Sequence, residues 1–316
     1  MWINTHVSSY NITKTWYDTT VSNQTITMAK KDDKYGSPQL RTQFPTDAAC
    51  LEVIFDTTHE RACSCGGQYK QLVDRLQFQC SKCRSQIAPL VGTIFQKSHI
   101  PLRSWFQALV MFSNAKSGLS SKYLEREINV NYKTAWRILT LIRKQLGQGG
   151  QKLRGNVEMD EGYFGGKGYA GKNNELLSIV MSKKSSVVAA VQRGGDIKAE
   201  VTPNVTARTI GGFLDKNIEP NGTRLLTDQS NRYDSVAKQY NRHSVDHGRK
   251  EYVRGDVHVN NVESFWAHIK RSIKGTHKAV SKKYLQSYLD GFVWHRNNRY
   301  SDRARFEALL AVLIHA

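Results

Sequence analysis

The sequence predicts an α/β protein in which a mixed sheet flanked by helices follows two smaller N-terminal modules. Two observations support this. The hydrophobic period is helical from Pro101 to Leu146 and alternates beyond residue 156. All five cysteines lie within residues 50–83. With 316 residues, of which 39% are hydrophobic, the chain is long enough for about two domains with real cores.

The chain is strongly basic, with 46 Lys and Arg against 27 Asp and Glu and a net charge of +19. Such an excess favours a polyanionic partner. No apolar run approaches the ~20 residues that a membrane span needs, and the N-terminus lacks the pattern of a secretion signal. We therefore expect no membrane association and an intracellular location: the cytoplasm or nucleoid of a bacterial host, or the nucleus of a eukaryotic one.

Composition and periodicity divide the chain into five segments. Residues 1–45 are polar and aperiodic, which predicts a disordered arm. The other four are a cysteine-bearing module at 46–97, a helical module at 98–146, a glycine-rich linker at 147–155 and the sheet domain at 156–316.

The cysteine-bearing module contains "CSCGGQYKQLVDRLQFQCSKC", whose spacing resembles a zinc ribbon. Two short turns would supply four thiolates for a tetrahedral zinc ion. The predicted ligands are Cys63, Cys65, Cys80 and Cys83. The first pair has a one-residue gap where two residues are usual, so His59 or Cys50 could replace a ligand, or the site could have lost its metal. Cys50, within "DAACLEVIF", is expected in the core of an amphipathic helix.

The helical module begins with "PLRSWFQALVMFSNAKSG", one amphipathic helix. It continues with "LSSKYLEREINVNYKTAWRILTLIRKQLG", which predicts a short helix, a turn at 129–131 and a second helix, the helix-turn-helix pattern. The second helix would expose four side chains able to reach DNA phosphates or base edges: Lys133, Thr134, Arg137 and Lys144. The alternative is a three-helix bundle with a solvated basic face. The overall charge favours DNA contact.

The sheet domain opens with "NVEMDEGYFGG", in which Val157 and Met159 alternate with Glu158 and Asp160, so these two acids share one face of a strand. "LLSIVMS", "SSVVAAVQ" and "IKAEVT" predict further strands, and "ARTIGGFLDKNI" predicts a helix. "TRLLTD" is a short strand that ends in Asp228. Helices are expected at the stretch "HVNNVESFWAHIKR" and from residue 281 to about 299.

Three acids are expected to form the site. Asp160 and Asp228 become neighbours if their strands pair centrally, and Glu263 on the following helix could approach from the side. Carboxylates so close raise one another's pKa values unless divalent cations neutralise them. Oxygen ligands suit Mg²⁺ or Mn²⁺, and two such ions about 4 Å apart can activate a nucleophilic oxygen and stabilise a leaving oxygen of a phosphodiester. Glu158 and Glu161 are expected to have structural roles.

Lys270, seven residues after Glu263 and on the same helical face, could hold a substrate phosphate. "GKGYAGKN" at 166–173 almost spells a phosphate-binding loop, but it has Asn173 in place of the Ser or Thr that would hold Mg²⁺. We therefore do not expect nucleotide hydrolysis.

The motifs "VEMDEGYFGGK", "TDQSNRY" and the block from Glu251 to Arg299 resemble bacterial insertion-sequence transposases of the zinc-ribbon type, the branch related to eukaryotic Merlin elements. The resemblance covers about residues 46–300. It implies a ribonuclease-H-like catalytic core with a DDE triad. It further implies an enzyme that binds terminal inverted repeats, hydrolyses DNA phosphodiesters and joins the 3′-OH ends to target DNA by two-metal in-line displacement.

Carried over by residue, Asp160 and Asp228 match the first two acids of the triad, and Glu263 matches the third. Some relatives place Asn in the third role, so Asn260 is the reserve candidate. Lys270, Arg271 and Lys274 would hold phosphates. The implied partner is double-stranded DNA, as element ends and as target, bound by a homodimer or larger assembly. The alternatives are a DNA-binding regulator with an inert catalytic domain and a nuclease without joining activity.

Overall fold

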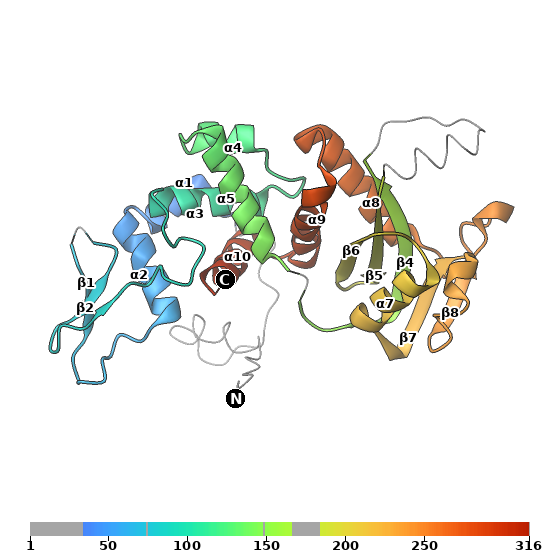
Figure 1. Cartoon of the computed structure of the whole chain (residues 1–316), viewed down its shortest axis with the longest axis horizontal. Helices are drawn as coiled ribbons and strands as arrows, with labels where there is room; N and C mark the ends of the chain where they lie inside the picture. Colours follow the sequence, from blue (N-terminus) through green and yellow to red (C-terminus); the bar gives the residue numbers. More distant parts are fainter. Residues whose placement is uncertain (1–33, 74, 148, 166–183, 316) are drawn as a thin grey trace. The chain divides into compact units, whose positions relative to one another are not determined.

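The computed structural model describes residues 34–73, 75–147, 149–165 and 184–315 (Figure 1). The predicted elements "GKGYAGKN" and "LLSIVMS" lie outside these ranges. The described residues divide into two compact units, one of residues 34–103 and 300–315 and the other of those between Ser104 and Arg299. In the described part of the chain, no helix combines the length and the apolar character needed to cross a membrane.

The first unit combines short helices with a small antiparallel sheet. Its elements are α1 (Ser37–Gln43), α2 (Asp47–Thr58), β1 (Tyr69–Gln71), β2 (Phe78–Cys80), β3 (Gln86–Ile87) and α10 (Asp302–Ile314), and its sheet order is β1-β2-β3. Phe55 of α2 stacks on Phe78 of β2 with ring centroids 3.9 Å apart, so the helix supplies the core under the sheet. Cys50 is fully buried in α2, as predicted.

The prediction of a disordered arm is wrong for residues 34–45, which include α1. Tyr35 and Phe44 contact Phe306 of α10, with ring centroids 5.1 and 6.3 Å apart, and Leu40 is buried. This short polar segment is ordered by packing on the other end of the chain, which local periodicity does not reveal. The remainder of the arm, residues 1–33, lies outside the described part.

The helical part of the second unit contains most of α3 (Leu102–Asn114), together with α4 (Ser121–Glu127) and α5 (Tyr132–Gln145). The turn falls at the predicted place: Asn129 has a φ of 51°, and the Asn131 side chain caps α5 by accepting from the Thr134 N–H at 2.8 Å. Ala135, Leu139 and Ile142 are buried, as expected.

A mixed sheet forms the rest of this unit and confirms the α/β prediction. Its strands are β4 (Leu153–Phe164), β5 (Ser185–Gln192), β6 (Ile197–Thr202), β7 (Ile218–Asp228) and β8 (Asn241–Val245), in the order β6-β5-β4-β7-β8. The β4–β5 and β5–β6 pairs are antiparallel, and the β4–β7 and β7–β8 pairs are parallel. The antiparallel half is built from consecutive strands, and the crossover through α7 (Ala207–Asn217) brings β7 to the other side of β4 (Figure 1).

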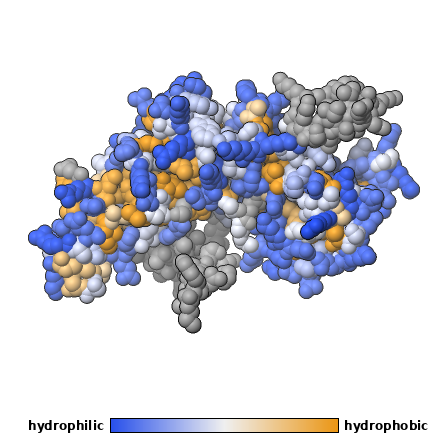
Figure 2. All heavy atoms as spheres, in the orientation of Figure 1, coloured by the Kyte–Doolittle hydropathy of each residue, from blue (hydrophilic) through white to orange (hydrophobic). Residues whose placement is uncertain are grey.

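Helices cover both faces of this sheet. Val157 and Met159 pack with residues of α7 on one face. On the other face lie α8 (Asn260–Ser272) and α9 (Lys282–Asn297), with the π-helical segment η3 (Ile273–His277) at the end of α8. Glu158 and Asp160 lie on the α8 face, as the alternation predicted. On the side shown in Figure 2, the surface around the sheet is mostly hydrophilic.

The domain boundaries inferred from sequence stay predictions. In the structure α10 belongs to the first unit, and α4 and α5 belong to the same unit as the sheet.

Candidate active site

The pairing of β4 with β7 brings two acids together. Glu158 lies opposite Leu226 in this parallel pair, so Asp160 comes beside Asp228, the last residue of β7. Within the described ranges, Asp160, Glu161 and Asp228 form an acidic group in which one carboxylate oxygen of each residue lies within 4.8 Å of the others. Central pairing of the two strands therefore makes Asp160 and Asp228 neighbours, and Glu161 joins them.

The pKa values of Asp160 and Glu161 are raised in this group. Burial raises the pKa of Asp160, and the charges of Asp228 and Glu263 raise it further, while hydrogen bonds from the Glu161 backbone and from Trp266 lower it. Burial also raises the pKa of Glu161 to about 7, opposed by the hydroxyl of Tyr233. Half-buried carboxylates that hinder one another's ionisation are the arrangement that a cation relieves.

Asp228 shows where a cation would fit. Its Oδ1 atom is buried and has no hydrogen-bond partner among the described residues. A buried carboxylate oxygen without a donor is costly, and a metal ion satisfies it. The three acids offer oxygen ligands alone, which suits Mg²⁺ or Mn²⁺. The donor set therefore fits the predicted ions.

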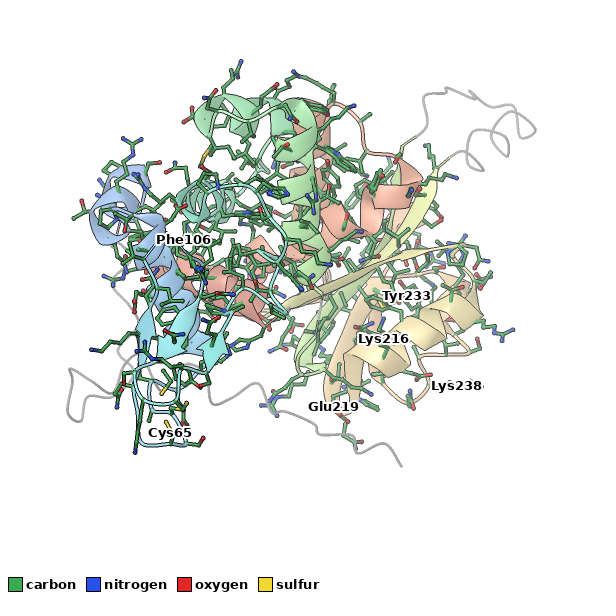
Figure 3. The ribbon with its side chains drawn as sticks, turned by 60° about the vertical axis from the view of Figure 1, so that its left-hand side comes forward. Cys65, Phe106, Lys216, Glu219, Tyr233 and Lys238 are labelled. Atoms are coloured by element: carbon green, nitrogen blue, oxygen red, sulfur yellow. The ribbon has the colours of Figure 1, made fainter. Side chains whose placement is uncertain are left out.

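Two residues that sequence reasoning missed hold this end of the sheet. Arg242 of β8 donates to the carbonyls of Asp228 and Ser230, both at 3.1 Å. Tyr233, in the 3₁₀ turn η1 (Asn231–Tyr233), is fully buried and donates its hydroxyl to Glu161 at 2.8 Å. Figure 3 labels Tyr233 beside the sheet and α7. No local pattern marks these side chains, because Arg242 acts through the pairing of β7 with β8 and Tyr233 through a contact with β4.

Helix α8 carries the third predicted acid. Glu263 lies in its first turn and is exposed, and Glu263 is close enough to Asp160 to raise its pKa, although it is outside the 4.8 Å group. Asn260, the reserve candidate, is the exposed first residue of the helix. One turn after Glu263, the indole N–H of Trp266 donates to Asp160 at 3.0 Å.

Gly162 allows this close approach of helix and strand. A Cβ at Gly162 would lie 3.1 Å from the Trp266 ring. Glycine therefore lets the indole lie against β4 and reach Asp160.

The predicted phosphate-binding side chains lie on exposed helical surfaces. Lys270, Arg271 and Lys274 are exposed near the end of α8, with Lys270 5.9 Å from the Phe164 ring. On α5, Lys133, Arg137 and Lys144 are exposed and Thr134 is half-buried. A shallow surface hollow at the start of α5 is lined by Asn131, Tyr132, Lys133, Thr134 and Arg137.

The four predicted zinc ligands converge in the first unit. The Sγ atoms of Cys63, Cys65, Cys80 and Cys83 all lie within 4.8 Å of one another, and Figure 3 shows sulfur atoms gathered at Cys65. The Cys63–Cys83 and Cys65–Cys80 sulfur separations are 3.7 and 3.5 Å. Tetrahedral zinc with bonds of about 2.3 Å would hold sulfurs roughly 3.8 Å apart. The one-residue gap therefore does not prevent convergence, and His59 and Cys50 lie outside this group.

Three comparisons bear on the class of protein. Residues 152–297 match the family model of the ISXO2-like transposase domain. A relative from Halobacterium salinarum, described as an uncharacterized protein in transposable element ISH50, is 28% identical over 229 residues, which are 68% of this chain and 76% of the relative. A chain in the crystal structure of a pre-cleavage Mos1 transpososome is 13% identical in sequence to this chain. The similarity covers 66% of this chain and 74% of that chain, with a TM-score of 0.28. The Mos1 mariner paired end complex with Mn is 11% identical, with a TM-score of 0.25 over the same shares.

The domain match and the relative from a transposable element support a transposase. The particular domain that is matched is the ISXO2-like one, and it contains Asp160, Asp228 and Glu263. The predicted resemblance is therefore confirmed as far as a transposase from an insertion element. The zinc-ribbon type and the relationship to Merlin elements stay predictions. TM-scores as low as those of the two Mos1 structures do not establish a common fold.

Proposed function

We propose that this chain is a DDE-type DNA transposase that cuts phosphodiesters at the ends of its element and joins the 3′-OH ends to target DNA. One observation carries the proposal. Asp160 and Asp228 lie side by side on adjacent parallel strands with their carboxylate oxygens within 4.8 Å, and Oδ1 of Asp228 has no partner among the described residues.

The sheet supports a ribonuclease-H-like core. Three consecutive antiparallel strands are followed by two strands parallel to the first, and the acids lie on the first strand and the fourth. A helix with the third acid then packs against the first strand. This order agrees with the catalytic core that the sequence motifs implied.

Asp160 and Asp228 would hold divalent cations, with Glu263 completing the set and Asn260 as its substitute. When bound, two such ions supply activation of a nucleophilic oxygen and stabilisation of the leaving oxygen. Glu161 is the further ligand that the geometry offers, since its carboxylate lies with those of Asp160 and Asp228. The protein's own contribution is to orient Asp160 through the hydrogen bond from Trp266 and Glu161 through that from Tyr233, while Oδ1 of Asp228 has no donor among the described residues.

DNA would be held by the basic helical surfaces. Between residues 264 and 289 the chain contains six Lys and Arg and no Asp or Glu, so the end of α8 and the start of α9 form a positive surface. Lys270, Arg271 and Lys274 belong to it and would contact phosphates. Helices α4 and α5 would read the terminal repeats through Lys133, Thr134, Arg137 and Lys144. Pairing two element ends requires a dimer or larger assembly.

The cysteine group would bind a structural zinc ion. Closed sets of four cysteines serve folding rather than catalysis. Hydrogen bonds, chiefly from the Cys65 backbone, lower the pKa of Cys63 to about 5, which favours the thiolate that zinc requires.

Magnesium-dependent nicking tests the proposal. The substrate is a labelled duplex from the genomic DNA flanking the gene, where the terminal inverted repeats are expected. Wild type should nick it, and Asp160→Asn should bind it equally well without nicking. Equal nicking by both proteins would exclude the assignment of Asp160. An inactive wild type that binds the repeat would favour the DNA-binding regulator, and cut 3′ ends that are never joined to target DNA would favour a nuclease.

A further inference from the structure

We propose that Glu158 is a positioning residue, which holds the start of α8 so that Glu263 faces Asp160 and Asp228. This inference rests on the proposed function for its catalytic consequence, whereas its structural part stands on contacts alone. Glu158 lies two residues before Asp160 on β4 and is fully buried.

The Glu158 carboxylate caps α8 from a different element. The residue at the N-cap of α8, Val259, makes no side-chain cap hydrogen bond. Instead, Oε2 of Glu158 accepts from the backbone N–H groups of Asn261 and Val262 at 2.7 and 3.3 Å. These are among the first N–H groups of a helix, which have no partner within it, and a negative charge there also complements the helix dipole.

The other carboxylate oxygen fixes the chain that leads into the helix. Oε1 of Glu158 accepts from Asn261 Nδ2 and from Arg193 Nε, both at 2.7 Å. The same Arg193 side chain donates to the carbonyls of Asp256 and His258 at 2.8 and 3.1 Å. A buried carboxylate is tolerable only when paired and fully hydrogen-bonded. Here its partners are the first turn of α8 and Arg193, which in turn holds the chain that leads into α8.

The two anchors of α8 match in spacing. Glu158 and Asp160 are two residues apart on β4, about 6.6 Å of strand. On α8, the partners of Glu158 are Asn261 and Val262, five and four residues before Trp266, or about 7.5 and 6 Å of helix. The spacing of the two acids on β4 therefore matches the spacing of their partners on α8, which fixes how far the helix is shifted along the strand. Glu263 lies between the two anchors, so its carboxylate is placed by both.

The experiment uses the full chain with Glu158→Gln. An amide can accept from the N–H groups of Asn261 and Val262, but its NH₂ would face the donors of Arg193. Three quantities are measured: nicking of a supercoiled plasmid carrying the gene and its flanking DNA, Mn²⁺ affinity by calorimetry, and hydrogen exchange of the first turn of α8. We expect nicking to fall about 10- to 100-fold, as for residues that orient a metal ligand. Mn²⁺ affinity should fall less than in Asp160→Asn, because Asp160 and Asp228 stay in place on the sheet while Glu263 does not, and exchange at 260–266 should accelerate.

Two further variants keep the result interpretable. Thr206→Ala removes the cap of α7, where Thr206 Oγ1 accepts from the Thr209 N–H at 3.3 Å, and should speed exchange there with nicking unchanged. If Glu158→Gln does not fold, Arg193→Lys keeps the charge and loses the fork that grips two carbonyls, and should show the same pattern more weakly.

The proposal is overturned if Glu158→Gln nicks like wild type, if exchange of the α8 turn is unchanged, or if Mn²⁺ affinity falls as far as in Asp160→Asn. The last result would mean that Glu158 acts through β4 itself. A wild-type protein that does not nick, indistinguishable from Asp160→Asn, would defeat the proposed function instead, and the exchange result would then decide whether Glu158 anchors α8.

Discussion

The cysteine group of the first unit and the acidic group of the second are both assembled from segments that are distant in the sequence. They differ in the size of the sheet that carries them. The thiols lie on and beside strands of two or three residues, packed on one helix. The acids lie on a five-stranded sheet covered on both faces. We expect so small a sheet to depend on a bound metal, and the larger sheet, which folds around its own core, to tolerate acids that repel one another. On this proposal the cysteine group contributes to stability and the acidic group to function.

The largest expected effect concerns Asp228. Asp228→Asn should lower nicking about 1,000-fold or more, because it removes a ligand of ions that contribute several kcal/mol to transition-state stabilisation. The same change should raise the free energy of unfolding of the metal-free protein by about 1 kcal/mol, since it removes one of three carboxylates that repel one another. Nicking in Mg²⁺ and calorimetry in EDTA measure the two effects. A destabilised apo protein would contradict the claim that this sheet stands without metal.

In the first unit, loss of a predicted metal ligand is expected to lower stability instead of raising it. Cys80→Ala should abolish binding of about one zinc per chain and unfold the small sheet, because structural zinc energy is folding energy. Zinc content and limited proteolysis within residues 60–90 measure this. Cys50→Ala is the matched control, since Cys50 is a buried core residue and its loss should cost about 1 kcal/mol while zinc is retained. A full zinc equivalent in Cys80→Ala would refute the four-cysteine site.

A moderate effect is expected for the positive surface of α8. Lys274→Ala should reduce the slope of log K against log salt for a random duplex by about 0.9, the contribution of one phosphate contact. Lys238→Ala, an exposed lysine that follows η1, is the control and should leave the slope unchanged. Equal slopes for Lys274→Ala and wild type would remove this surface from the DNA path.

The smallest effect is a pH dependence within the second unit. Burial, and then the charge of Arg143, lower the pKa of His277 to about 4. The unfolded chain therefore binds this proton below its ordinary pKa near 6.5 and the folded chain does not, so stability present above pH 6.5 is lost as the pH falls towards 4. Wild type should lose about 2 kcal/mol more than His277→Gln across this window. Denaturant midpoints at pH 7 and pH 4.5 measure it, and parallel losses would show that His277 is not responsible.

Much of the fold was predictable because the strands are locally distinctive. The runs 185–192 and 197–202 are apolar or alternating and bounded by turn residues, and they form β5 and β6 as expected. Strand β8 was missed because it reads "NRHSV", the polar sequence of an edge strand, and its pairing is set by β7. Helix α1 was missed because its apolar partner, Phe306, lies at the far end of the chain.

The candidate site divides in the same way. Asp160 and Asp228 could be paired from sequence because Asp160 lies in one predicted strand and Asp228 ends another. Arg193, Tyr233 and Arg242 could not, since each acts through a contact that exists after the sheet has assembled. Glu161 was expected to have a structural role, and alternation places it on the opposite face of β4 from Asp160. Beside Asp228, where β7 ends, both carboxylates nevertheless join the same group.

The hydrogen bond from Trp266 to Asp160 couples the fluorescence of this tryptophan to the state of the carboxylate. Any cation that draws on this carboxylate changes the electric field at the indole, and tryptophan emission reports such changes. Occupancy of the acidic group can thus be followed by fluorescence titration without DNA, and Trp266→Phe supplies the blank.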